Sequence, residues 1–189
     1  MPTDDRKLTM DELGRVDAEG YKAMAKRRIR LVLDDVRSRH NVGSMFRTAD
    51  AFGLEGLTLC GFTPCPPHRE IEKTALGATL SVPWEHHPSV PDALAALRAA
   101  GYAVWCVEQT LRAVPMDRWA PDPEVPLALV FGNELSGVSD AAIALASGCL
   151  VLPQHGTKHS LNVSVCAGIA CWHAAYSGAH PREMEAPPL

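Results

Sequence analysis

The sequence has neither an excess of positive charge nor a long apolar run. Its 189 residues hold 18 Lys and Arg against 22 Asp and Glu, for a formal net charge of -4. A balance of this sign argues against a protein that coats nucleic acid through bulk electrostatics. No segment approaches the roughly 20 consecutive apolar residues that span a bilayer, so we expect no membrane contact.

The chain also lacks a cysteine framework and a secretion signal. Its six cysteines form no C-x-x-C pair, and most lie in apolar runs such as VWCVE and GCLVL. Such thiols are expected to be buried and reduced. The first residues, MPTDDRKLTMDEL, contain no apolar stretch typical of a signal peptide, which favours a cytoplasmic protein.

Strand-like and helix-like segments alternate along the chain. The sequence predicts strands at 28–34, 56–60, 102–108, 126–131 and 149–152, and helices at 42–52, 91–100, 139–147 and 160–176. Helix C-caps are expected at four glycines, Gly53, Gly101, Gly148 and Gly178. The alternation predicts an α/β domain with a mostly parallel sheet flanked by helices on both faces.

We expect this domain to occupy residues 28–178, after a helical extension at 1–27 and before a flexible tail at 179–189. Thr9 and Glu12 form a capping box ahead of an intermittent apolar face. This pattern predicts a helix over residues 9–27.

Two proline-rich stretches, 61–68 and 110–125, interrupt the alternation and are predicted as loops. Trp119 in the second stretch is expected to be exposed. In open parallel sheets, the loops beyond the carboxyl ends of the strands build the binding site.

One segment is strongly basic although the whole chain is acidic. Residues 22–47 contain eight of the 18 basic residues and only two acids. The cluster Lys26, Arg27 and Arg28 fits an RNA-binding face. A solvated surface followed by a charged strand start explains it equally well.

Asn41, Gly43 and Arg47 form the first motif, N-x-G-x-x-x-R, at the start of a predicted helix. Gly43 and Arg47 share a helix face, so the glycine is expected to leave room across which Arg47 reaches. A helix N-terminus with a guanidinium suits a phosphate or a developing oxyanion. An ion-paired surface arginine is the more frequent explanation of this spacing.

The second motif follows the apolar run LALVF. Asn133, Glu134 and Ser136 lie between two glycines, Gly132 and Gly137. A glycine at a strand end lets a ligand approach the backbone, and a carboxylate accepts hydrogen bonds from an amine or hydroxyl. A tight turn explains the same residues equally well.

The third motif, LPQHGTKHSLNVSV, joins a strand end at Leu152 to an apolar helix. Gly156 gives the loop freedom to fold over a ligand, and Ser160, Leu161 and Asn162 lie where the helix begins. The helix is apolar nearly all round, so we expect it to be buried. Its small residues suit close contact with another helix, for example in a subunit interface.

Two histidine pairs raise the question of a metal site. His155 and His159 are four residues apart, but no third His or Cys lies at a suggestive spacing. His86 and His87 are expected at the surface, at the end of a strand. We therefore predict no metal ligands.

Taken in this order, the three motifs resemble the SpoU, or TrmH-like, class of the SPOUT superfamily of RNA methyltransferases. The matching stretches are HNVGSMFRTADAFG, VFGNELSG and LPQHGTKHSLNVSV, within residues 28–177. The resemblance implies S-adenosylmethionine as cofactor and a homodimer that methylates a ribose 2′-hydroxyl in tRNA or rRNA. It also implies a C-terminal deep trefoil knot, which pattern reasoning alone would not predict.

The resemblance implies roles for individual residues. The cofactor would be held by Gly132, Asn133, Glu134, Gly137, Leu152, Gly156, Ser160, Leu161 and Asn162. The catalytic residues would be Arg47, Asn41, Ser160 and Asn162, and RNA would contact Lys26, Arg27, Arg28 and Arg47. Arginine keeps its proton to a pKa above ~12. We therefore expect Arg47 to position a phosphate and stabilise the developing alkoxide, with Asn41 orienting the ribose.

Two other functions stay open at this level. A noncatalytic RNA-binding or assembly factor could retain the cofactor fold, but it would need neither Arg47 nor the polar residues of the other motifs. An α/β enzyme that binds another nucleotide or phosphate is disfavoured, because the phosphate loop and the dinucleotide fingerprint are missing.

Overall fold

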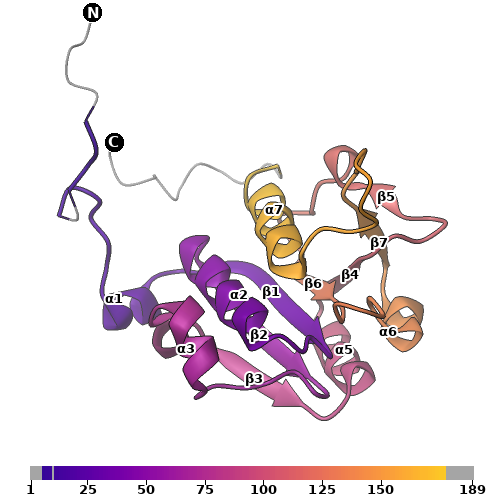
Figure 1. The fold of residues 1–189 in the computed structure, drawn as a ribbon, viewed down its shortest axis with the longest axis horizontal. Helices are drawn as coiled ribbons and strands as arrows, with labels where there is room; N and C mark the ends of the chain where they lie inside the picture. Colours follow the sequence, from indigo (N-terminus) through magenta and orange to yellow (C-terminus); the bar gives the residue numbers. More distant parts are fainter. Residues whose placement is uncertain (1–5, 10, 178–189) are drawn as a thin grey trace, which may run out of the picture.

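The computed structural model describes residues 6–9 and 11–177. Its strands are β1 Arg27–Asp34, β2 Leu54–Cys60, β3 Trp84–His87, β4 Ala103–Val107, β5 Val114–Pro115, β6 Leu127–Phe131 and β7 Gly148–Val151. They form one sheet in the order β3-β2-β1-β6-β4-β7-β5, and every neighbouring pair is parallel (Figure 1). The predicted parallel α/β class is confirmed, while the knot stays an implication of the family.

Helices cover both faces of the sheet. They are α1 Ala18–Ala23, α2 Arg39–Ala51, α3 Arg69–Ala75, α4 Ala78–Ser81, α5 Val90–Ala99, the 3-10 helix Met116–Arg118, α6 Asp140–Leu145 and α7 Val163–Tyr176. Leu31 and Leu33 of β1 belong to the cluster formed with α2, α3 and α7, whereas Val32 faces the cluster with α5 and α6. Successive strand residues point to opposite faces, so β1 is buried on both sides, as predicted.

The helix predicted over residues 9–27 is wrong in extent. The capping box forms, since the Thr9 amide donates to Glu12 and the Glu12 amide to the Thr9 hydroxyl, at 2.8 and 3.3 Å. Only a turn follows, because Gly14 adopts a left-handed φ of 57° that ends it. The helix that does form, α1, begins at a different cap, Asp17.

Several short helices and strands were not predicted from the sequence. Helices α3 and α4 and strand β3 fill the region after the first proline-rich loop, and β5 and the 3-10 helix lie inside the second. Strand β3 has mostly exposed residues, WEHH, so no apolar alternation marks it. Gly148, predicted as a helix C-cap, is the first residue of β7. Gly178 and the tail at 179–189 lie outside the described residues.

Trp119 is half-buried, contrary to the predicted exposure. Its ring lies 5.4 Å from that of Trp105 and stacks on His173 of α7 at 6.2 Å. The second proline-rich stretch is therefore packed against α7. Within the described residues, no helix is long and apolar enough to cross a membrane.

Candidate functional site

A cavity of about 510 Å³ lies at the carboxyl ends of β4, β6 and β7. Most residues predicted to hold a cofactor line it, namely Gly132, Asn133, Glu134, Gly137, Leu152, Ser160, Leu161 and Asn162. Gly156 does not line it. The second and third motifs, which are separate in sequence, thus form the walls of one cavity at the edge where open parallel sheets bind ligands.

A chain of hydrogen bonds joins all three motifs beside this cavity. The Asn41 side-chain amide donates to Glu134 Oε1 at 2.8 Å, and the Asn162 amide donates to Asn41 Oδ1 at 3.2 Å. Asn162 is also the N-cap of α7, because its Oδ1 accepts from the Ser164 and Val165 amides. The predicted helix start at residue 160 is therefore corrected to Val163.

Glu134 holds the chain just before α2 rather than pointing free into the cavity. Its carboxylate accepts from the backbone amides of Arg37 and Ser38, each at 3.0 Å, as well as from Asn41. Partial burial raises the pKa of Glu134, but these hydrogen bonds outweigh it and lower the pKa overall. The ionised carboxylate therefore fixes the start of α2 against the second motif.

The glycine and asparagine of the second motif serve the turn itself. A Cβ at Gly132 would overlap the backbone of Gly137 and Val138, so the missing side chain lets this loop fold onto itself. The Asn133 side chain accepts from the Leu135 and Ser136 amides and donates to Asp35 O at 2.7 Å. Of the two sequence explanations, the tight turn accounts for these contacts.

Two residues that line the cavity belong to none of the three motifs and were not predicted. Glu108 follows β4 and accepts from the Gln109 and Val138 amides at 2.7 and 2.9 Å. Gln109 donates from Nε2 to the carbonyl of His159 at 2.6 Å. Both line the cavity. The carboxyl end of a predicted strand followed by polar residues was the signal that could have found them.

Arg47 does not line this cavity. It is exposed and borders a second hollow of about 760 Å³ between α2, α3 and α7, together with Lys73, Ile169 and Trp172. Asn41 lies six residues earlier on α2. Because each residue of a helix turns by about 100°, the side chains of Asn41 and Arg47 point about 120° apart, on different faces of α2. Asn41 therefore faces the motif junction, whereas Arg47 faces the hollow.

Gly43 leaves no room for a ligand, contrary to the sequence analysis. A Cβ there would overlap Ile71 O and Thr74 Oγ1 of α3. The glycine instead allows α2 and α3 to pack closely. Arg47, one turn later, lies at the edge of the same contact, beside Lys73 and Thr74.

Helix α7 is only half-buried, contrary to the prediction. Its small residues Ala167, Ala170 and Ala174 are buried against the core. An apolar stripe on its outer side is exposed, formed by Val165, Ile169, Trp172 and Tyr176, at 42–58% exposure. The stripe borders the hollow that contains Arg47.

The basic cluster predicted to bind RNA is largely engaged within the chain. Lys26 donates to Tyr21 O and Met24 O and lies over the Tyr21 ring at 3.9 Å, and burial lowers its pKa. Arg27 donates to Ala175 O at 3.0 Å, which ties the start of β1 to the end of α7. Arg28 is exposed.

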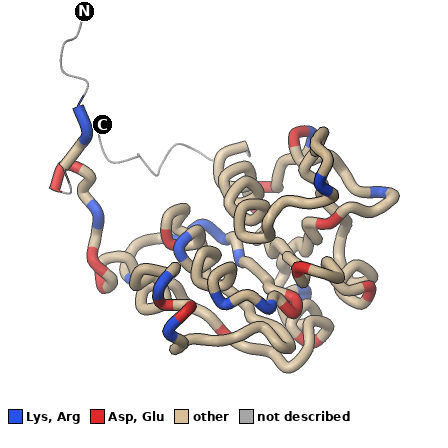
Figure 2. Tube along the Cα trace, viewed as in Figure 1, with Lys and Arg blue, Asp and Glu red and all other residues tan. Residues whose placement is uncertain are grey.

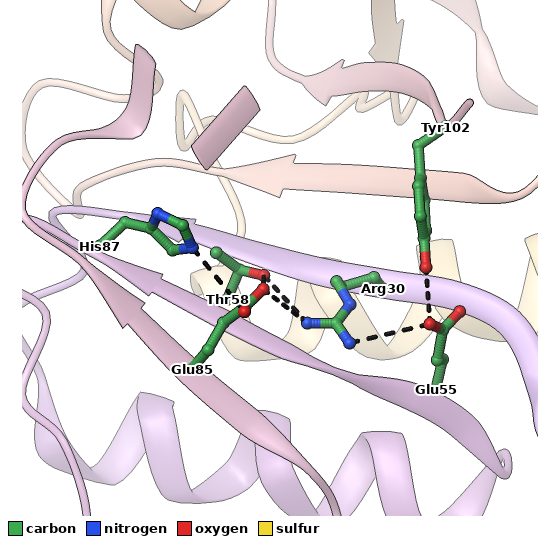
Figure 3. A network of polar contacts seen from close by, with 6 residues as sticks. All are labelled: Arg30, Glu55, Thr58, Glu85, His87 and Tyr102. Atoms are coloured by element: carbon green, nitrogen blue, oxygen red, sulfur yellow. Dashed lines mark hydrogen bonds and ion pairs between the residues drawn. The ribbon is translucent and has the colours of Figure 1, made fainter. Parts of the chain in front are cut away.

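Arg30, in the same basic segment, lies in a polar network (Figure 3). Like Val32, it points to the face of the sheet opposite α2 and α7. It pairs with Glu85 at 2.7 Å and with Glu55 at 3.7 Å, and its side chain is 15% exposed. Burial, and then the hydrogen bond to Glu55, raise the pKa of Tyr102 to about 12. Figure 2 shows further basic positions along α2 and α3. Arg47 belongs to α2 and Lys73 to α3.

The residues present fit S-adenosylmethionine. A cavity of this size is in the range that holds a small ligand, roughly 300–1,000 Å³. Apolar side chains of Phe131, Leu150 and Val163 line it beside polar groups such as Glu108 and Ser160. Such walls suit a molecule with a purine ring and a charged amino-acid part. Among the described residues, no group of three or more His, Cys, Asp or Glu could hold a metal ion.

The fold and cavity define an α/β protein with a ligand-sized cavity where parallel strands end and α7 begins. A model of the SpoU rRNA Methylase family matches residues 28–172, so the chain belongs to this family. The resemblance seen in the three motifs is confirmed.

Known relatives include a Thermus thermophilus tRNA (guanosine(18)-2′-O)-methyltransferase, 33% identical over 76% of this chain and 72% of its own. The Bacillus subtilis 23S rRNA (guanosine(2553)-2′-O)-methyltransferase RlmP is 31% identical over 76% of this chain and 56% of its own. A solved structure, the Streptomyces viridochromogenes SpoU methyltransferase AviRb with AdoMet, superposes with a TM-score of 0.71 at 26% identity. That match covers 84% of this chain and 63% of AviRb.

Proposed function

We propose that this protein transfers a methyl group from S-adenosylmethionine to a ribose 2′-hydroxyl in tRNA or rRNA. The observation that carries the proposal is the cavity in which the second and third family motifs meet beside Asn41. Bound S-adenosylmethionine supplies a methyl group activated by its sulfonium. It would give this methyl group to the ribose oxygen and leave as a neutral thioether, and the hydroxyl proton would pass to solvent water.

The chain's own residues align the reactants. Gly132, Leu152 and Leu161 would hold the cofactor, and Ser160, in the loop before α7, adds a hydroxyl. Asn41 donates to Glu134 and accepts from Asn162, so the two asparagines act by fixing this geometry. The guanidinium of Arg47 is proposed to hold a substrate phosphate and stabilise the developing alkoxide.

We propose a homodimer in which the exposed stripe of α7 packs against a second copy. Val165, Ile169, Trp172 and Tyr176 form a continuous apolar row on one side of the helix. A contiguous exposed apolar patch of this kind marks an interaction site. Because the hollow with Arg47 borders this row, the partner would lie next to Arg47.

Replacing Ile169 with aspartate is expected to convert the dimer to a monomer, because a buried unpaired carboxylate is costly in an apolar interface. Sedimentation or light scattering measures the mass. Leu111→Asp is the matched control, since Leu111 is fully exposed on the loop after β4 and should leave the mass unchanged. An unchanged mass for Ile169→Asp would contradict the α7 interface.

Two measurements test the proposed reaction. Calorimetry is expected to show binding of S-adenosylmethionine and not of ATP or NAD. Mapping of ribose methylation in RNA from cells with and without the protein identifies the modified nucleotide. If RNA binds while S-adenosylmethionine does not, a noncatalytic RNA-binding factor replaces the enzyme as the better explanation.

A further inference from the structure

We propose that Gln109 is a positioning residue that latches the loop 153–161 closed over the cavity and so sets the affinity for the cofactor. The loop follows β7 and ends where Asn162 caps α7, and residues 153–161 are exposed. Gln109 belongs to none of the three motifs. The link to cofactor affinity rests on the proposed function, whereas the latch itself does not.

The loop has few attachments to the body of the protein. Within residues 6–9 and 11–177, the bond from Gln109 Nε2 to His159 O, at 2.6 Å, is the hydrogen bond that ties it to another part of the chain. The other side-chain bond of the loop is local, from Gln154 Nε2 to Leu152 O at 3.5 Å. A segment tied to the rest of the chain by one hydrogen bond is expected to open locally without global unfolding.

Gln109 is itself held rigidly. It lies two residues beyond β4, and its backbone amide donates to Glu108 Oε1 at 2.7 Å. The other oxygen of Glu108 accepts from the Val138 amide, and the Glu108 amide donates to Leu150 O of β7 at 3.0 Å. The donor of the latch is thus anchored to β7 and to the residue that follows the second motif, while its acceptor lies in the exposed loop. Gln109, His159 and the second motif all line the same cavity.

The test uses trypsin on the full chain without cofactor. Lys158 is exposed, and the bond after it precedes the latched carbonyl of His159. Gln109→Ala should raise the cleavage rate at Lys158 by roughly two- to tenfold, which corresponds to the net free energy of one hydrogen bond. Gln109→Glu should do so at least as strongly, because its carboxylate faces a carbonyl.

Gln154→Ala and Gln154→Glu are the matched controls, because Gln154 also lines the cavity but bonds only within its own segment. Their cleavage at Lys158 should stay within about twofold of the wild-type rate. Cleavage at Arg15, exposed in the N-terminal segment, should be equal in all variants. Equal cleavage at Lys158 in Gln109→Ala and the wild type would overturn the latch.

Cofactor measurements then separate the two proposals. S-adenosylmethionine should slow cleavage at Lys158 in the wild type, and Gln109→Ala should raise the KM for it by the same factor as the cleavage rate. The kcat of Gln109→Ala at saturating cofactor and its melting temperature should equal those of the wild type. If Gln109 merely supported the fold, both would fall. If Gln109→Ala loosens the loop but S-adenosylmethionine protects neither protein, the proposed function fails and the latch stands.

Discussion

Arg47→Ala is expected to lower the kcat of methyl transfer by roughly 10²–10³-fold, the usual effect of removing one group that stabilises a developing oxyanion. Arg47 is exposed on α2 and borders the hollow rather than the core, so the melting temperature should hold. Cofactor binding should hold as well, because the residue does not line the cofactor cavity. Transfer of labelled methyl groups to RNA, with calorimetry, measures both.

Arg47→Lys separates charge from geometry. Lysine keeps the positive charge but loses the planar, two-pronged donor that matches a phosphate. We expect it to recover only part of the lost kcat. Near-normal turnover in Arg47→Lys would contradict a bidentate role, and normal turnover in Arg47→Ala would contradict the catalytic assignment altogether.

Gly43→Ala is expected to destabilise the protein by about 1–3 kcal/mol, although alanine is the better helix former. The new methyl group would overlap Ile71 O and Thr74 Oγ1, and a backbone carbonyl cannot rotate away as a side chain does. The melting temperature should fall by roughly 2–10 °C. Chemical denaturation measures the loss of unfolding free energy.

Gly168→Ala is the matched helical control for Gly43→Ala. A Cβ at Gly168 meets no atom within 4 Å, so alanine should stabilise α7 by about 0.5–1 kcal/mol. Both variants are compared in an Ile169→Asp background, where the proposed dimer cannot mask the effect. Equal shifts for the two glycines would mean that contact between α2 and α3 does not require Gly43.

Regular, strongly apolar elements were predictable from sequence because burial leaves a local pattern. β6 is a continuous apolar run that is buried throughout, and β1 contains the apolar run Leu31, Val32 and Leu33, which is buried on both faces of the sheet. The short elements α3, α4, β3 and β5 have no such pattern and were missed. The helix predicted at 9–27 was wrong although its local signal was real. The capping box of Thr9 and Glu12 forms, but Gly14 ends the turn that follows it.

The sequence by itself determined the class of protein, the parallel α/β fold and most of the residues around the cavity. Only the tertiary structure decided what their atoms do. Glu134 and Asn41 are 93 residues apart, so no spacing rule could show that they bond to each other. The same folding turned Gly43 toward α3 and left the α7 stripe outside. Local pattern fixes which face of an element is apolar, but partners distant in the chain fix which polar groups are satisfied and which stay free to act.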